Sequence, residues 1–160
     1  EILHEAVPSD TIKVKRFKAS KALCGWNTEG QDYHKKLDEA MVAYKEVYGI
    51  MKRHYGFLMD VSEAEKGCFV KEAEFIKFDD HMFESSNEAE LLEFPAGEYA
   101  CFIGREERGK LDFSSLFSWL GKNGRETDMI VADEIGLQLL DIDKTNHILD
   151  IRAHLKRIKK

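Results

Sequence analysis

Tyrosine and methionine side chains repeat at helical spacing in the first third of the chain and could contact a ligand. Because buried hydroxyls need hydrogen-bond partners, a row of tyrosines with no phenylalanine is more typical of the rim of a cleft than of a sealed core. We place Tyr48, Met51 and Tyr55 nearest to a ligand, and Met51 would let that surface adapt its shape. The alternative is that the same stripe is ordinary helix core. The stripe between residues 33 and 55 consists of Leu37, Met41, Tyr44, Tyr48, Met51 and Tyr55.

A second aromatic set lies in residues 111–120. Phe113, Leu116, Phe117 and Leu120 fall on one helical face, and Trp119 lies beside them. Trp119 is a candidate wall of a binding site, and a structural role for it is equally open. Asp112 or Ser114 is suited to cap this helix.

The sequence lacks the motifs of metal sites and of nucleophilic catalysis. Its six histidines show no HxH or HxxxH spacing, and no GxSxG, GxGxxG or P-loop occurs. Cys24, Cys68 and Cys101 are odd in number and lie in mainly apolar sequence, which indicates buried free thiols in a reducing, cytoplasmic compartment. We therefore expect no metal, no cofactor and no catalytic residue.

Composition narrows the partners further. The chain has 160 residues and a formal charge of -6, which predicts one domain over residues 1–160 and argues against a direct nucleic-acid contact. Its apolar runs are far shorter than the roughly 18 residues that span a bilayer, so no membrane partner is expected. The first residue is Glu1, which suggests that the sequence was cut from a longer chain or processed.

The order of predicted elements is the same in both halves. In the first half a strand is predicted at 11–23, with a bend at 18–20, and a helix at 33–55, which ends before Gly56. Two more strands are predicted at 57–59 and 68–78, with a polar turn at 63–67. After an acidic connector they are predicted again at 92–104, 111–120, 131–142 and 147–158, and Pro95 and Gly97 mark an edge or a bulge in the first of these strands.

Shared residues support a tandem duplication. Phe17, Ala19 and Cys24 correspond in spacing to Phe94, Ala96 and Cys101. The expected fold is α+β, with pseudo-repeats at about 11–80 and 91–160 that form one antiparallel sheet and place two helices on one face. A groove between the helices would suit a small ligand.

The sequence resembles the GyrI-like effector-binding domains. The resemblance rests on the segment 91–100 (LLEFPAGEYA), a short helix ending FSWL at 117–120, and DEI at 133–135. In that family such domains form the ligand-binding part of MerR-type and AraC-type multidrug-responsive transcription regulators, and also occur alone. The resemblance implies a duplicated strand-helix-strand-strand fold, an aromatic pocket without catalysis, an upstream DNA-binding domain, and contacts from Tyr99 and Phe117.

The resemblance also assigns a role to Glu134. A glutamate near the start of the strand after the second helix attracts lipophilic cations in multidrug-sensing members, and Glu134 is the best match here. A carboxylate in an apolar cleft has lost water and gains strongly from a cation. Alternation places Glu134 with Gly136 and Gln138, opposite Ile135, Leu137 and Leu139, so it points either to a ligand or to water.

Two other functions stay open. Some stand-alone relatives are thought to hydrolyse reactive electrophiles, and Glu134 or Glu98 could activate water if loss of solvent raised its pKa. The third possibility is an interaction module whose cleft is filled by its own side chains.

Overall fold

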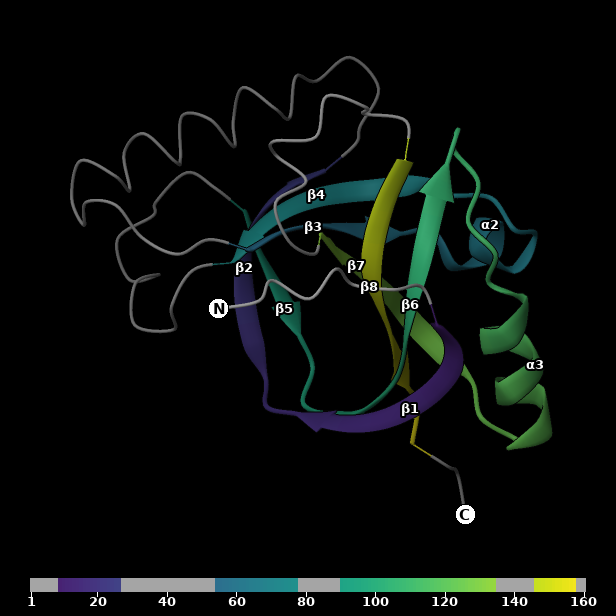
Figure 1. The fold of residues 1–160 in the computed structure, drawn as a ribbon. Helices are drawn as coiled ribbons and strands as arrows, with labels where there is room; N and C mark the ends of the chain where they lie inside the picture. The colour runs from purple at the N-terminus through teal and green to yellow at the C-terminus, as the bar shows by residue number, and fades with distance from the viewer. Residues whose placement is uncertain (1–8, 27–53, 78–89, 135–145, 158–160) are drawn as a thin grey trace, which may run out of the picture.

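The sheet dominates the structure, a computed structural model that describes residues 9–26, 54–77, 90–134 and 146–157. In this part of the chain eight strands form one antiparallel sheet in the order β1-β6-β8-β7-β3-β4-β2-β5, which confirms the predicted α+β class (Figure 1). The strands are β1 (Ser9–Phe17), β2 (Ser20–Trp26), β3 (His54–Met59), β4 (Lys71–Lys77), β5 (Glu90–Phe94), β6 (Gly97–Glu107), β7 (Thr127–Glu134) and β8 (Asn146–Leu155). The helices are α2 (Val61–Glu65) and α3 (Ser114–Lys122).

The strand order is symmetric. It reads the same from either end when β1 is exchanged with β5, β2 with β6, β3 with β7 and β4 with β8. The register follows the same rule: Phe17 pairs with Gly97, and Ser20 pairs with Phe94. Phe17 corresponds to Phe94 and Ser20 to Gly97, and the two residues of each correspondence are 77 positions apart (94 − 17 and 97 − 20). Two copies of one unit would produce this pairing.

Two bent strands form a single ribbon that joins the ends of the sheet. The ladder between β1 and β6 resumes between β2 and β5 in unchanged register, beyond bends at 18–19 and 95–96. Pro95 cannot donate a ladder hydrogen bond, and Gly97 has a φ of +139°, which a side chain would resist. The sheet therefore curls strongly on itself; the bend predicted at 18–20 is confirmed, and the irregularity predicted at Pro95 and Gly97 is a second bend.

Two cores lie on opposite faces of the sheet. Both helices pack on the first, which we call the helix-side core; the second we call the opposite core. Strand alternation separates them, since Phe57 and Met59 belong to the helix-side core and Leu58 to the opposite core. The buried members of the helix-side core are Phe57, Met59, Ala64, Ala100, Phe102, Leu111, Phe113, Leu116, Leu120, Ile130, Ala132, Leu149, Ile151, Ala153 and Leu155. Those of the opposite core are Ala22, Cys24, Leu58, Ala73, Phe75, Leu92, Phe94 and Val131.

The helix predicted for residues 33–55 lies mostly outside the described residues. Its end was wrong, because His54 and Tyr55 belong to β3. Tyr55 continued the helical spacing, but strand pairing with β4 and β7 outweighs that local pattern. The turn predicted at 63–67 is partly the short helix α2, whose first turn is capped by Asp60, which accepts a hydrogen bond from the Glu63 N–H at 3.0 Å.

The second half differs from prediction mainly at strand boundaries. Asp112 accepts a hydrogen bond from the Ser114 N–H at 2.9 Å, at the start of α3. β7 begins at Thr127 instead of residue 131 and is described to Glu134, so the predicted strand at 135–142 falls outside the described residues. Neither helix in the described part of the chain is long and apolar enough to cross a membrane.

Gly56 is needed where β3 passes between β4 and β7. A Cβ on Gly56 would lie 2.5 Å from Phe75 Cζ and 2.7 Å from the Ala132 carbonyl oxygen. We expect Gly56→Ala to lower the free energy of unfolding by about 1–3 kcal/mol, measured as a lower urea midpoint at constant m. Gly121→Ala is the control, because its Cβ would meet no atom within 4 Å. It should raise stability by about 0.5–1 kcal/mol; equal losses in both variants would contradict this packing.

Candidate functional site

Glu134 ends β7 on the side of the sheet that carries the helices. It follows Ile130 and Ala132 in steps of two, and both belong to the helix-side core. Its side chain is half-buried. In the adjoining strand, Gly56 pairs with Asp133, so the antiparallel register brings Tyr55 to the position beside Glu134. Two positions selected from the sequence are thus adjacent in the register at the centre of the sheet.

A second carboxylate on the same side was missed from the sequence. Glu74 of β4 is 3% exposed and pairs in register with Phe57, a member of the helix-side core. The ammonium of Lys71 lies 3.7 Å from Glu74 Oε1 and 3.8 Å from the centre of the Phe57 ring. An aromatic face and a buried carboxylate therefore already hold one cation on this surface. The only sequence signal was a glutamate within an otherwise strand-like run, and a solvent-facing position explained it equally well.

The aromatic residues of α3 lie over this same core. Phe117 and Trp119 are partly buried and pack against the helix-side core, while Leu116 and Leu120 are buried within it. Tyr48 and Met51 lie outside the described residues. Of the predicted ligand-contacting residues, Glu134, Phe117 and Trp119 are therefore on the helix side, and the backbone of Tyr55 runs beside Glu134.

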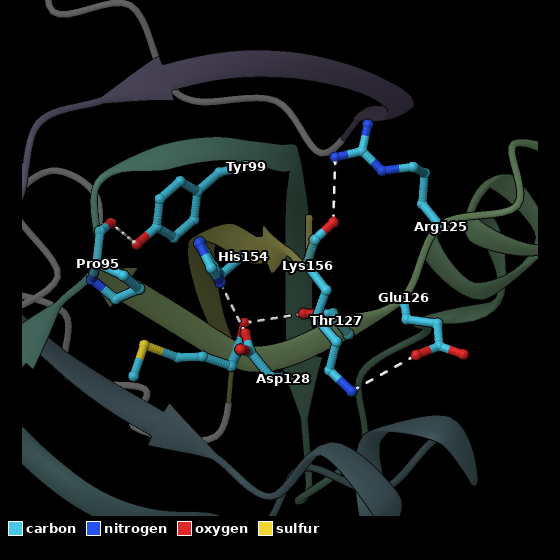
Figure 2. A network of polar contacts seen from close by, with 9 residues as sticks. Pro95, Tyr99, Arg125, Glu126, Thr127, Asp128, His154 and Lys156 are labelled. Carbon is cyan, nitrogen blue, oxygen red and sulfur yellow. Dashed lines mark hydrogen bonds and ion pairs between the residues drawn. The ribbon is translucent and has the colours of Figure 1, made fainter. Parts of the chain in front are cut away.

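Tyr99 lies on the other side of the sheet. It is 4% exposed, and its hydroxyl donates to the Pro95 carbonyl at 2.6 Å (Figure 2). Its ring packs edge-on against Phe17 and tilted against His154. Burial, reinforced by the charge of Asp128, raises the pKa of Tyr99 to about 12. The structure does not bring Tyr99 together with Phe117 and Trp119.

A histidine and a carboxylate adjoin Tyr99. His154 Nδ1 of β8 lies 2.7 Å from Asp128 Oδ1 near the start of β7, as Figure 2 shows. A carboxylate has no proton to give, so Nδ1 is the donor in this bond. No sequence motif links positions 128 and 154, because only the β7–β8 ladder brings them together.

Further along β8, Arg152 is held by two carboxylates and a ring. Its guanidinium lies 2.9 Å from Asp150, 3.8 Å from Asp133 and 4.5 Å from the centre of the Phe17 ring. Burial works to lower the pKa of Arg152, but the two aspartates outweigh it and raise the pKa. Burial also raises the pKa of the Cys101 thiol to about 11, so this cysteine is a poor nucleophile at neutral pH.

Known proteins with this fold include the C-terminal domain of EcmrR, a protein solved in complex with DNA, and a protein described as a hydrolase. No protein-family model matches the sequence, and no curated protein matches it either. The C-terminal domain of EcmrR is 12% identical with a TM-score of 0.61, and the match covers 92% of this chain and 98% of that domain. In the EcmrR–DNA complex the TM-score is 0.58 and this chain spans 58% of the longer EcmrR chain. A hydrolase encoded by lin2189 from Listeria innocua is 9% identical with a TM-score of 0.59, and the match covers 93% of each chain. At these identities the likeness establishes a shared fold.

The raised pKa of Tyr99 predicts a loss of stability at high pH. The folded chain keeps the Tyr99 proton up to about pH 12, whereas an unfolded tyrosine loses it near pH 10. The free energy of unfolding should therefore fall as pH rises from about 10 to about 12. Tyr99→Phe should flatten that fall and cost about 1 kcal/mol at neutral pH, where only the bond to Pro95 is lost. Urea unfolding of both proteins at several pH values tests this, and parallel curves would refute it.

Proposed function

We propose that this chain is a small-molecule effector-binding domain whose ligand lies on the helix side of the sheet, against Glu134. The observation that carries the proposal is the position of Glu134, which follows Ile130 and Ala132 on the helix-side face of a central strand. A half-buried carboxylate beside an apolar core is partly stripped of water, so a ligand that neutralises it gains more than it would at an open surface.

The preferred ligand is a lipophilic cation. Glu74 is a second carboxylate on the same face, two strands from Glu134, and the position of Lys71 beside Glu74 and over the Phe57 ring supports a preference of this surface for positive groups. The net charge of -6 acts in the same direction at long range. A neutral ligand of similar size would bury the same apolar area but would gain nothing from the carboxylates.

Aromatic side chains complete the proposed site. Phe117 and Trp119 of α3 pack at the margin of the helix-side core, and Tyr55 is next to Glu134 in register. Tyr48 and Met51, chosen from their spacing, are proposed as further contacts. We leave Tyr99 out of this site because its ring lies across the sheet and its hydroxyl is already bonded to Pro95.

The domain would act as the sensor part of a bacterial transcription regulator. The fold is that of the EcmrR C-terminal domain, and EcmrR is known in complex with DNA. With its acidic balance, this chain is a poor partner for DNA phosphates, so we propose that an upstream domain makes the DNA contact. The free thiols of Cys24, Cys68 and Cys101 suit a reducing cytoplasm.

Hydrolysis is a second candidate, favoured by the Listeria innocua neighbour described as a hydrolase. In this reading Glu134 would accept a proton from a water that attacks an electrophile held on the helix side. The two functions differ in one result: a hydrolase turns over its substrate, and an effector domain only binds its ligand.

Binding of tetraphenylphosphonium provides the test, with triphenylphosphine oxide as the neutral comparison. We expect the cation to raise the melting temperature and to quench tryptophan fluorescence, since Trp119 packs against the core on the side of the sheet proposed to bind the ligand. Glu134→Gln should weaken the cation about tenfold, the low end of the range for a partly screened charge pair, and leave the neutral compound nearly unchanged.

Glu126→Gln is the matched control. Glu126 precedes β7, is exposed, and forms an ion pair with Lys156 at 3.5 Å. This variant should bind both compounds like the wild type. Equal loss of cation binding in the two variants would show that net charge, and not Glu134, attracts the cation. Absence of any shift with either compound would count against the binding function itself.

A further inference from the structure

The polar groups around His154 occupy one half of the sheet face that faces away from the helices, and the fold does not require them there. The symmetric register supplies the comparison, because each position on β6 and β8 has a counterpart 77 residues earlier (99 − 22 and 152 − 75). Tyr99 corresponds to Ala22 and Arg152 to Phe75, both in the opposite core. His154 corresponds to Lys77, at the end of β4.

The same backbone is thus stable with an apolar face in its first half. In the second half a tyrosine and an arginine replace an alanine and a phenylalanine, while His154 stands where the first half has a lysine, and each of the three has a polar partner. Such groups cost folding energy unless they are paired. A local departure from the apolar pattern is expected at a functional site.

The geometry points to His154 as a nucleophilic imidazole, held by Asp128, that accepts an acyl group from small activated esters. Asp128 fixes the ring through Nδ1 at 2.7 Å, which leaves the lone pair of the neutral ring on Nε2. Among the described residues Nε2 has no hydrogen-bond partner. This is the arrangement by which a carboxylate prepares a histidine for attack or proton transfer.

Gly97 places no side chain against Nε2 of His154, whose side chain is 14% exposed. A Cβ at residue 97 would sit 3.5 Å from Nε2, in van der Waals contact with the atom that must react. The φ of +139° at Gly97 disfavours any larger residue. The ring is supported on its other side by Tyr99, whose centroid is 5.1 Å away and whose hydroxyl is bonded to Pro95.

The reaction has two balanced steps. Nε2 attacks the acyl carbon, the bond to the leaving oxygen breaks, and its electron pair leaves with the phenolate. Asp128 stabilises the positive charge that the ring gains, and loss of the Nδ1 proton to solvent gives a neutral acyl-imidazole. Water then adds to the acyl carbon, the carbon–Nε2 bond breaks, and the carboxylic acid leaves while the ring recovers its Nδ1 proton.

The probe is 4-nitrophenyl acetate, with release of nitrophenolate followed at constant protein concentration. His154→Gln should lower the second-order rate at least tenfold relative to the wild type. His147→Gln is the matched control, a histidine of the same strand β8, and should change the rate less than twofold. Equal rates in the wild type and His154→Gln would overturn the assignment, as would equal losses in both histidine variants.

Asp128→Asn tests the positioning role without removing the imidazole. The groups that face His154 are Asp128 on β7, Tyr99 on β6 and Arg152 on its own strand. With the carboxylate gone, the rate of nitrophenolate release should fall several-fold, because the positive charge that the ring gains is no longer stabilised. Asp128→Glu, which keeps a carboxylate, should retain more of the rate than Asp128→Asn. An unchanged rate in Asp128→Asn would overturn the role of Asp128.

Labelling with diethyl pyrocarbonate keeps the assignment testable if His154→Gln does not fold. Peptide mass analysis of the wild-type protein should find His154 modified at Nε2 under native conditions. If the other histidines react and His154 does not, Nε2 is inaccessible and the proposal fails. This outcome is independent of cation binding at Glu134, which lies on the other side of the sheet.

Discussion

The bent ribbon formed by β1–β2 and β5–β6 is the constraint on which the rest of the structure depends. Its two strands stay in one register through both bends, so β6 can pair with β8 while β2 pairs with β4. Each half of the chain therefore contributes one strand to each end of the sheet: β1 and β6 lie at one end, and β2 and β5 at the other. The symmetric strand order and the strong curvature both follow from this exchange.

The two faces of the curved sheet have different characters. On the helix side, an apolar core is bordered by Glu134, Glu74 and the aromatic rings of α3. On the other side, the opposite core shares the face with the polar side chains of Tyr99, Arg152 and His154. Because side chains alternate along each strand, a single strand such as β7 supplies Glu134 to one face and Asp128 to the other.

Much of this arrangement could be predicted from the sequence, since local patterns mark local structure. The bends at 18–20 and at Pro95, and the apolar face of α3, were all visible as residue types at fixed spacings. The duplicated order was visible too, from the repeated sequence of predicted elements together with three shared residues. What failed was a boundary: Tyr55 fits a helical stripe by its spacing, yet it belongs to β3, where pairing on both sides decides the structure.

The polar sites were harder to foresee because they depend on pairing across the sheet. Glu134 was found only through a resemblance, and alternation within its own strand left its direction open until Ile130 and Ala132 were found in the helix-side core. His154 and Asp128 are 26 residues apart and share no motif. Glu74 appears in the sequence as one more charged residue of an acidic chain, and its burial reflects the strands beside it.

The ribbon also determines the order in which the chain can fold. Its partners are far apart in sequence, from Cys24 with Glu90 to Lys13 with Cys101, so most of the chain must be brought together before its first pair forms. The entropy cost of closing these long loops must be met before the strand pairs contribute any stabilisation. The hairpin-like pairs β3–β4 and β7–β8 are separated by much shorter segments and can form first. The ribbon is then the late, slow step, and until it forms, the two hairpins expose unpaired edges that invite association between chains.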